Sequence, residues 1–225
     1  MLGSPLLGPS VWRPVAHCLN RLGWPVTVPP APDAAPRTPD DVLRHLVSAL
    51  PSDRDLVLVP HSNAGVYVPE LVAACRIVAF VFVDARLPAA AGAVPLGSAD
   101  IVDQLGRMAD RDGLLPPWTQ WWDPADVAAL FPDQATQDLI EREQFRLPLA
   151  YFEQVLPDRP GWDRRPGAYL AFGDTYATER ADASRRGWPV ATLPGEHLHM
   201  LMRPDEVATA LDALLTSIGR RPGDG

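Results

Sequence analysis

Residues 55–74 contain the feature that most restricts how this chain can fold: an apolar run, a tight turn that bears a serine, and a helix-forming segment. The run Leu56–Val59 has the length and composition of a strand that is buried on both faces. His61-Ser62-Asn63 and two small residues follow, and Val66–Ala74 is predicted to be a helix. A buried strand that turns directly into a helix is typical of parallel α/β sheets.

The turn at Ser62 is compatible with a nucleophile elbow, whose pattern is Gly-x-Ser-x-Gly. Such a turn holds the serine hydroxyl above the sheet edge and directs the N–H groups of the next helix toward it. Here the two glycine positions hold Pro60 and Ala64. Alanine is a small replacement, whereas proline fixes φ and removes a backbone donor. Two interpretations stay open: an elbow that presents Ser62, or an ordinary turn in which Ser62 caps the helix.

Strand-sized apolar segments alternate with helices along most of the chain, which predicts a three-layer α/β fold with a mostly parallel sheet of about six strands. With 225 residues, of which 47% are hydrophobic, the chain is expected to form one domain over residues 1–225. The predicted strands are Pro25–Pro29, Leu56–Val59, Ile77–Asp84, Ala168–Phe172 and Val190–Leu193, and the predicted helices are Trp12–Leu22, Asp40–Leu50, Val66–Ala74, Thr178–Arg186 and Pro204–Ile218.

The alternation stops between residues 88 and 165, where we expect several short helices without intervening strands. One of them begins at Asp123-Pro124, because an aspartate cap followed by proline at the first helical position favours a helix start. A helical insertion in a parallel sheet is predicted to lie as a lid over the carboxyl ends of the strands, where such sheets bind ligands. The other predicted helices of this insertion are Ser98–Asp110, Asp133–Gln144 and Leu149–Leu156.

Charge and composition exclude several classes of partner. The net charge is −8 and all 20 basic residues are arginine, which leaves no basic stripe for nucleic acid. No apolar run approaches the length of a membrane span, and the amino terminus has no basic segment of the kind that begins a signal peptide. Cys18 and Cys75 are expected to be free thiols in helices, which fits a reducing compartment. We therefore expect a cytoplasmic protein that binds neither nucleic acid nor membrane.

A loop with two histidines follows the last predicted strand. His197 and His199 lie between Val190–Leu193 and the helix that begins at Pro204. Because the carboxyl ends of parallel strands meet at one edge of a sheet, this loop is expected on the same side as Ser62. A neutral imidazole is a suitable base for a serine hydroxyl. A single histidine is often structural, but its position after the last strand favours a role beside Ser62.

Three segments resemble the α/β-hydrolase superfamily: HSNAG around Ser62, GEHLHMLMRPDEV around His197, and the opening SPLLGPSVWRPVAHCLNRLGWPV, with Trp12 where the family often has an aromatic residue. The resemblance covers nearly the whole chain, although residues 88–165 match only in being helical. It implies a serine, an acid and a histidine in that order. The family's histidine typically precedes the proline of the last helix by seven residues, so Pro204 implies His197, with His199 second.

The acidic partner of the histidine has two candidates. Asp84 closes the strand beside the predicted elbow strand, from where its carboxylate could reach the imidazole. The family usually takes its acid after the next strand, where Asp174 fits only with a shift of register toward Tyr176. Asp84 is preferred; without that role it would cap or hydrogen-bond the following loop.

The resemblance also implies two backbone N–H donors for an oxyanion. One is the N–H of Asn63, directly after Ser62. The other is expected from the loop Gly3–Leu6, where the simplest alignment places Pro5, which has no N–H. Leu6 replaces it if the loop is shifted by one residue. The strands that precede this loop in the family are missing here, which implies a sheet shortened at that edge.

Three tryptophans at positions 118, 121 and 122 lie within the predicted lid. An aromatic surface such as one containing Trp118 suits an apolar or ring-bearing ligand, and the alternative is that the rings only attach the lid to the sheet. His61 is expected to remain neutral and to point into the core or the pocket, where it would contact substrate.

The preferred function is an esterase- or thioesterase-like hydrolase for a fairly apolar acyl substrate, with Ser62, His197 and Asp84 as the acting residues and no metal or organic cofactor. Because fold does not dictate chemistry, a lyase, isomerase or cyclase on the same fold, or a ligand-binding module, is the alternative. The partner is a small-molecule substrate. Oligomeric state is left open, with a homodimer as one option.

Overall fold

The computed structural model describes residues 1–223, so the last two residues of the predicted 1–225 domain lie outside it. Its central sheet has the strand order β1-β3-β6-β7, with β2 paired to β3, and every pairing is parallel. This confirms the α/β class, with five strands rather than about six. The strands are β1 Leu56–Leu58, β2 His61–Ser62, β3 Ile77–Ala85, β6 Gly167–Phe172 and β7 Val190–Leu193.

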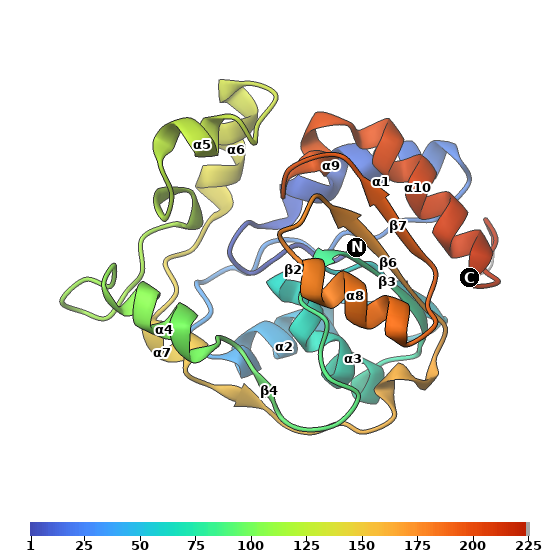
Figure 1. The fold of residues 1–225 in the computed structure, drawn as a ribbon, viewed down its shortest axis with the longest axis horizontal. Helices are drawn as coiled ribbons and strands as arrows, with labels where there is room; N and C mark the ends of the chain where they lie inside the picture. Colours follow the sequence, from blue (N-terminus) through green and yellow to red (C-terminus); the bar gives the residue numbers. More distant parts are fainter. Residues whose placement is uncertain (224–225) are drawn as a thin grey trace.

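Helices cover both faces of the sheet, which makes three layers (Figure 1). The first and last long helices, α1 and α10, pack against each other, and α10 also packs on β3, β6 and β7. The helix α8 packs on β6 and β7, and α2 packs on α3. The bounds are α1 Arg13–Arg21, α2 Pro39–Ala49, α3 Val68–Ala74, α8 Ala177–Arg185 and α10 Pro204–Ser217, with the short turns η1 Pro9–Trp12, η2 Asn63–Tyr67, η4 Trp162–Arg164 and α9 His199–Met202.

The strongest strand and the first capped helix follow directly from their residues. All residues of β3 are buried except Val78, which is half-buried, as its unbroken apolar run predicts. At the start of α2, Thr38 accepts the N–H of Asp41, and the Asp41 carboxylate accepts the N–H of Thr38 in return. This capping box begins the helix at Pro39, which needs no N–H in that position.

The predicted strand Pro25–Pro29 is wrong: the segment lies outside any strand. Its two end prolines cannot donate to a ladder, so the sheet gains nothing by adding it. The Thr27 carbonyl instead accepts from the amino group of Met1 at 2.6 Å. Leu2 forms an isolated parallel bridge with Pro60, which attaches the start of the chain to the sheet edge at that point.

The predicted helix Leu149–Leu156 is also wrong in its second half. The helix α7 ends at Phe152, and Val155–Leu156 forms β5, which pairs antiparallel with β4 at Val94–Pro95. The expectation of an insertion without strands therefore fails. Pro157 directly follows β5 and Pro95 lies in β4, which keeps this ribbon short.

The inserted segment otherwise consists of short helices, as predicted, and α5 and α6 lie at the upper left in Figure 1, away from the sheet. It is attached to the start of the chain by Glu143, whose carboxylate accepts both the N–H and the hydroxyl of Ser10. The elements are α4 Ala99–Gly106, η3 Trp118–Gln120, α5 Pro124–Ala128, α6 Gln134–Glu143 and α7 Leu149–Phe152.

Residues 1–223 include no helix with the length and hydropathy needed to cross a membrane. Cys18 is a buried free thiol in α1, whereas Cys75 is a half-buried free thiol just after α3 rather than within a helix. The cytoplasmic location and the option of a homodimer stay predictions.

Candidate active site

The turn between β2 and η2 holds Ser62 in a conformation that side-chain-bearing residues rarely adopt, with φ 57° and ψ −130°. Such strain persists only when neighbouring structure enforces it. One constraint is Gly65, because a Cβ at that position would lie 2.0 Å from the carbonyl oxygen of Arg86. Ala64, the residue before Gly65, is also buried. The hydroxyl of Ser62 is thereby held at the carboxyl end of the sheet.

Pro60 is accommodated because the strand breaks there. β1 ends at Leu58 and β2 begins at His61, and in the gap Pro60 supplies only its carbonyl, which accepts the N–H of Val83. A residue with an N–H would have donated toward β3 at this position, and proline cannot. The unusual proline in the Ser62 motif therefore interrupts the ladder without displacing the turn.

Ser62, His197 and Asp84 form one hydrogen-bonded chain. The Ser62 hydroxyl donates to His197 Nε2 with an Oγ–Nε2 distance of 3.0 Å, and His197 Nδ1–H donates to Asp84 Oδ2 at 2.6 Å. The other carboxylate oxygen of Asp84 accepts the N–H of Phe172 at 3.0 Å. Asp84 is fully buried and has φ 39°, the second strained backbone in the group. Both carboxylate oxygens are thus fixed before any ligand binds.

The two less preferred candidates lie elsewhere. Asp174 is 86% exposed and pairs with Arg180 at 2.9 Å, so it points into solvent rather than toward the imidazole. His199 is buried against Phe172, with its Nε2 at 3.8 Å from Glu206. The register shift needed to bring Asp174 to the imidazole does not occur.

His61 is not among the residues that line the cavity beside Ser62, although it was predicted to contact substrate. Its side chain contacts the His197 loop instead. Its Nε2–H donates to the backbone carbonyl of His197 at 3.0 Å, and the two imidazole centroids are 4.5 Å apart. Trp12 also packs against the His61 ring in an edge-on arrangement, with ring centroids 6.0 Å apart. His61 therefore supports the His197 loop from behind.

Burial lowers the pKa of His61 well below its usual value, and the nearby charge of His197 lowers it further. In the unfolded chain this imidazole titrates near its ordinary value of about 6.5, so below that pH the unfolded state binds the extra proton. The free energy of unfolding should consequently fall as pH decreases below 6.5, by up to about 1.4 kcal/mol per pH unit for this one proton.

The check is urea unfolding of the wild type and of His61→Gln between pH 5 and 8. Glutamine keeps an N–H donor for the His197 carbonyl but has no proton to gain. The variant should show a shallower loss of stability below pH 6.5. Parallel curves for the two proteins would mean that other groups carry the acid sensitivity.

Of the two oxyanion candidates in the first loop, Leu6 faces the cavity beside Ser62, whereas Pro5 lines a separate cavity behind the loop. The N–H of Leu6 is donated to the Ser4 hydroxyl at 3.3 Å, a long hydrogen bond. Asn63 also lines the cavity and is the first residue of η2, where backbone N–H groups have no partner within the helix.

Tyr176 also belongs to the site. From the sequence, this residue serves only to locate the acidic partner of the histidine, and no role of its own is predicted for it. Its hydroxyl lies 3.4 Å from Ser62 Oγ, and its ring centroid lies 5.7 Å from that of His197. Burial raises the pKa of Tyr176 to about 12, so the phenol stays protonated and can donate a hydrogen bond. The signal was its place directly after β6, in the loop Gly173-Asp174-Thr175-Tyr176.

A cavity of about 900 Å³ opens onto Ser62 and His197, with walls of aromatic and aliphatic side chains. Trp118 is buried in this wall with its ring centroid 6.0 Å from that of His197, while Trp122 is half exposed at the same cavity. The volume falls within the usual range for small-molecule sites. Its other apolar lining residues are Leu6, Leu96, Ile101, Trp121, Val127, Ala129, Leu130 and Phe152.

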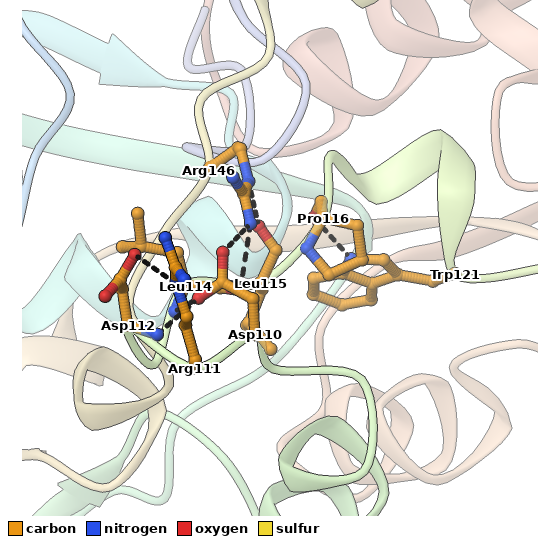
Figure 2. Close-up of polar contacts among 8 residues, drawn as sticks. All are labelled: Asp110, Arg111, Asp112, Leu114, Leu115, Pro116, Trp121 and Arg146. Carbon is orange, nitrogen blue, oxygen red and sulfur yellow. Dashed lines mark hydrogen bonds and ion pairs between the residues drawn. The ribbon is translucent and has the colours of Figure 1, made fainter.

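The segment that carries Trp118, Trp121 and Trp122 is held in place by polar contacts within the inserted segment (Figure 2). Arg146 donates to the carboxylate of Asp110 and to the carbonyls of Leu114 and Leu115, and Trp121 Nε1–H donates to Pro116 O at 2.8 Å. Trp121 also packs on Phe152. The rings therefore connect parts of the insertion to one another and line the cavity, and Trp118 also packs beside His197 in the loop after β7.

Within residues 1–223, no group of three or more His, Cys, Asp and Glu side chains is positioned to hold a metal ion.

No protein-family model and no curated protein matches the sequence. Solved structures are similar over nearly their whole length. An extracellular α/β-hydrolase from a Paenibacillus species, described as sharing structural and functional homology with tobacco Salicylic Acid Binding Protein 2, has a TM-score of 0.72 and 18% identity and covers 98% of each chain. A methylesterase from Arabidopsis has a TM-score of 0.67 and 17% identity over 96% of this chain and 97% of that one.

Methylketone synthase I from tomato is similar to the same extent, with a TM-score of 0.68 and 12% identity over 96% of both chains. At these identities the likeness is one of architecture, and these proteins differ in what their names say they do. The parallel sheet, the strained serine turn after its strand and the histidine loop after β7 agree with that architecture. The chain has the α/β-hydrolase fold.

Proposed function

We propose that this protein is a serine-dependent hydrolase that cleaves esters of a small, largely apolar carboxylic acid. The observation that carries the proposal is the hydrogen-bonded chain from Ser62 through His197 to Asp84, which opens onto the cavity at its serine end. A serine hydroxyl becomes a useful nucleophile only beside a base, and the base needs a third group to fix its orientation.

In the proposed reaction, Ser62 Oγ attacks the ester carbonyl while its proton passes to His197 Nε2. The imidazolium that forms is stabilised by Asp84, which accepts the Nδ1–H and is itself held by the Phe172 N–H. His197 then gives the proton to the departing alcohol, which leaves an acyl-Ser62 ester. Water attacks this ester with His197 again as base, releases the acid and restores the Ser62 hydroxyl.

The negative oxygen of the intermediate requires donors that face Ser62. The Asn63 N–H takes the position after the nucleophile, and the Leu6 N–H supplies the second donor. In the free protein the Leu6 N–H donates a long hydrogen bond to the Ser4 hydroxyl. To stabilise the intermediate, it must exchange this hydrogen bond for one to the negatively charged oxygen. Charge-assisted hydrogen bonds are the stronger type, so the exchange favours the intermediate over the free enzyme.

The apolar walls of the cavity fit a substrate with apolar or ring-bearing parts. The inserted segment would act as a lid that limits the access of bulk water to the cavity. Trp118 belongs to the lid, packs beside His197 and would contact the acyl group. Oxygen esters and thioesters both fit this chemistry, because the attack on the carbonyl is the same.

The proposal is tested with a fluorophosphonate probe and a panel of p-nitrophenyl esters and acyl thioesters of increasing chain length. We expect stoichiometric labelling that peptide mass spectrometry assigns to Ser62, and labelling should be lost in His197→Ala. Turnover of at least one ester series should accompany it. Absence of both labelling and turnover in folded protein would reject the hydrolase and favour non-hydrolytic use of the same cavity.

Removal of the Tyr176 hydroxyl tests a finer point. The phenol donates toward Ser62 Oγ across 3.4 Å, a long contact that strengthens when charge develops on that oxygen. Tyr176→Phe should lower kcat by about 5- to 10-fold, the equivalent of about 1 kcal/mol, with KM nearly unchanged. Steady-state kinetics with one p-nitrophenyl ester provides the measurement. A rise in KM at constant kcat would place the hydroxyl on the bound substrate rather than on the reacting oxygen.

A further inference from the structure

Arg86 is a basic residue on the wall of the cavity that contains Ser62, and the proposed reaction does not use it. Its backbone is fixed by the serine turn: the Arg86 N–H donates to Ser62 O at 3.1 Å, and the Arg86 carbonyl packs against Gly65. The side chain therefore starts from one of the best-defined points of the site, directly after the strand that bears Asp84.

The guanidinium group of Arg86 has few protein partners. Its Nη1–H donates to the carbonyl of Leu96 at 2.5 Å. Among residues 1–223 no carboxylate lies within 4.0 Å of it, in contrast to Arg180 or Arg159, which both form ion pairs. Burial lowers its pKa, and the nearby Tyr176 and Glu179 act in the opposite direction from a greater distance. The group carries five N–H donors, and most of them have no hydrogen-bond partner among residues 1–223.

A half-buried charge with unused donors is costly unless something pairs with it. Glu179 is an acidic residue of the cavity wall that acts electrostatically on Arg86 without forming an ion pair with it. Burial raises the pKa of the Glu179 carboxyl, and Arg86 acts in the opposite direction. The other acidic residues of the wall, Asp126 and Glu196, are exposed. The donors of Arg86 are therefore left for a group that enters the cavity.

We propose that Arg86 binds a carboxylate of the substrate, so that the preferred substrates are esters with an apolar body and a free carboxylate at the far end. This inference rests on the proposed hydrolase function for its catalytic readout. A planar guanidinium can bind a carboxylate through two parallel hydrogen bonds, which fixes the orientation of the ligand as well as its charge. Arg86 and Ser62 would then hold the two ends of one molecule, with the tryptophans against its middle.

The test uses matched pairs of substrates: p-nitrophenyl monoesters of glutaric and adipic acid against p-nitrophenyl pentanoate and hexanoate. In each pair a terminal carboxylate replaces a methyl group. For the wild type we expect kcat/KM to be at least about 10-fold higher for the carboxylate member of one pair. Arg86→Gln should abolish this preference while it changes kcat/KM of the neutral esters by less than about threefold, and Arg86→Lys should keep part of it.

Arg180→Gln is the matched control, since Arg180 forms its ion pair with Asp174 outside the cavity lining. The control should keep the preference for carboxylate substrates. Equal kcat/KM for both members of every pair in the wild type would overturn the inference. So would an equal fall for charged and neutral esters in Arg86→Gln, because that result indicates a purely structural brace for Leu96.

A binding experiment separates this inference from the proposed function. Calorimetry compares 4-phenylbutyrate with 4-phenylbutanamide on wild type, Ser62→Ala and Arg86→Gln, without any turnover. The carboxylate should bind at least about 10-fold more tightly to the first two proteins and lose that advantage in the third. If this holds while no ester is hydrolysed and no probe labels Ser62, the hydrolase fails but the carboxylate site stands. If esters are hydrolysed but the carboxylate ligand binds no more tightly than the amide, the hydrolase function stands and the carboxylate site fails.

Discussion

Ser62→Ala should lower kcat for p-nitrophenyl esters by about 10⁴- to 10⁶-fold, the largest effect that we expect from any single substitution in this protein. The reason is that Ser62 Oγ is the only protein atom that forms a covalent bond to the substrate in the proposed reaction. Residual rate above the uncatalysed reaction would come from the Asn63 and Leu6 donors and from binding in the cavity. Alanine also removes a hydroxyl that supports the strained turn only through His197 and Tyr176, so the fold should persist.

Three measurements check this prediction: steady-state kinetics, fluorophosphonate labelling and circular dichroism of the folded variant. Ser184→Ala is the matched control, because Ser184 is exposed on α8 and donates only to Arg180 O. The control should retain activity and labelling. If Ser62→Ala kept most of the wild-type kcat, Ser62 would be a hydrogen-bonding group and the acyl-enzyme mechanism would be wrong.

Asp84→Asn should lower kcat by about 10⁴-fold while the protein remains folded. Asparagine still accepts the Phe172 N–H with its carbonyl oxygen, but it offers no negative charge to the imidazolium and presents an NH₂ donor where Nδ1–H now donates. The histidine would then be held in the wrong tautomer for accepting the serine proton. Asparagine also tolerates the positive φ of this position better than most residues, so backbone strain adds little.

The paired variant Asp174→Asn decides between the two acids. Asp174 is exposed and pairs only with Arg180, so its loss should leave kcat within about twofold of the wild type. Kinetics of both variants with the same ester, together with thermal unfolding, gives the comparison. A large loss in Asp174→Asn with little loss in Asp84→Asn would mean that the His197 loop rearranges when substrate binds.

Much of the architecture could be predicted because its signals are local. β3 is an unbroken apolar run, and strand-forming segments alternate with helix-forming segments along the chain. Together these two patterns predict a parallel sheet with crossover helices, which is the observed topology. The cap at Thr38 and the proline at the start of α10 set helix ends within one residue of the prediction. Where local signals were ambiguous, the predictions failed: prolines exclude Pro25–Pro29 from the sheet, and Val155–Leu156 becomes a strand only because β4 lies beside it.

For the site, the residue pattern predicts that Ser62 stands on a turn after a buried strand and that a loop with His197 and His199 follows the last strand, and the resemblance favours His197 as the partner of Ser62. Parallel strands place such loops at the same edge, so these two residues could be paired before any coordinates were known. Three features became visible only in the folded chain: Asp84 rather than Asp174 meets His197, Leu6 rather than Pro5 faces the cavity, and Tyr176 reaches Ser62. Each of those outcomes depends on distances of a few ångströms between loops far apart in the chain, and residue patterns carry no information on that scale.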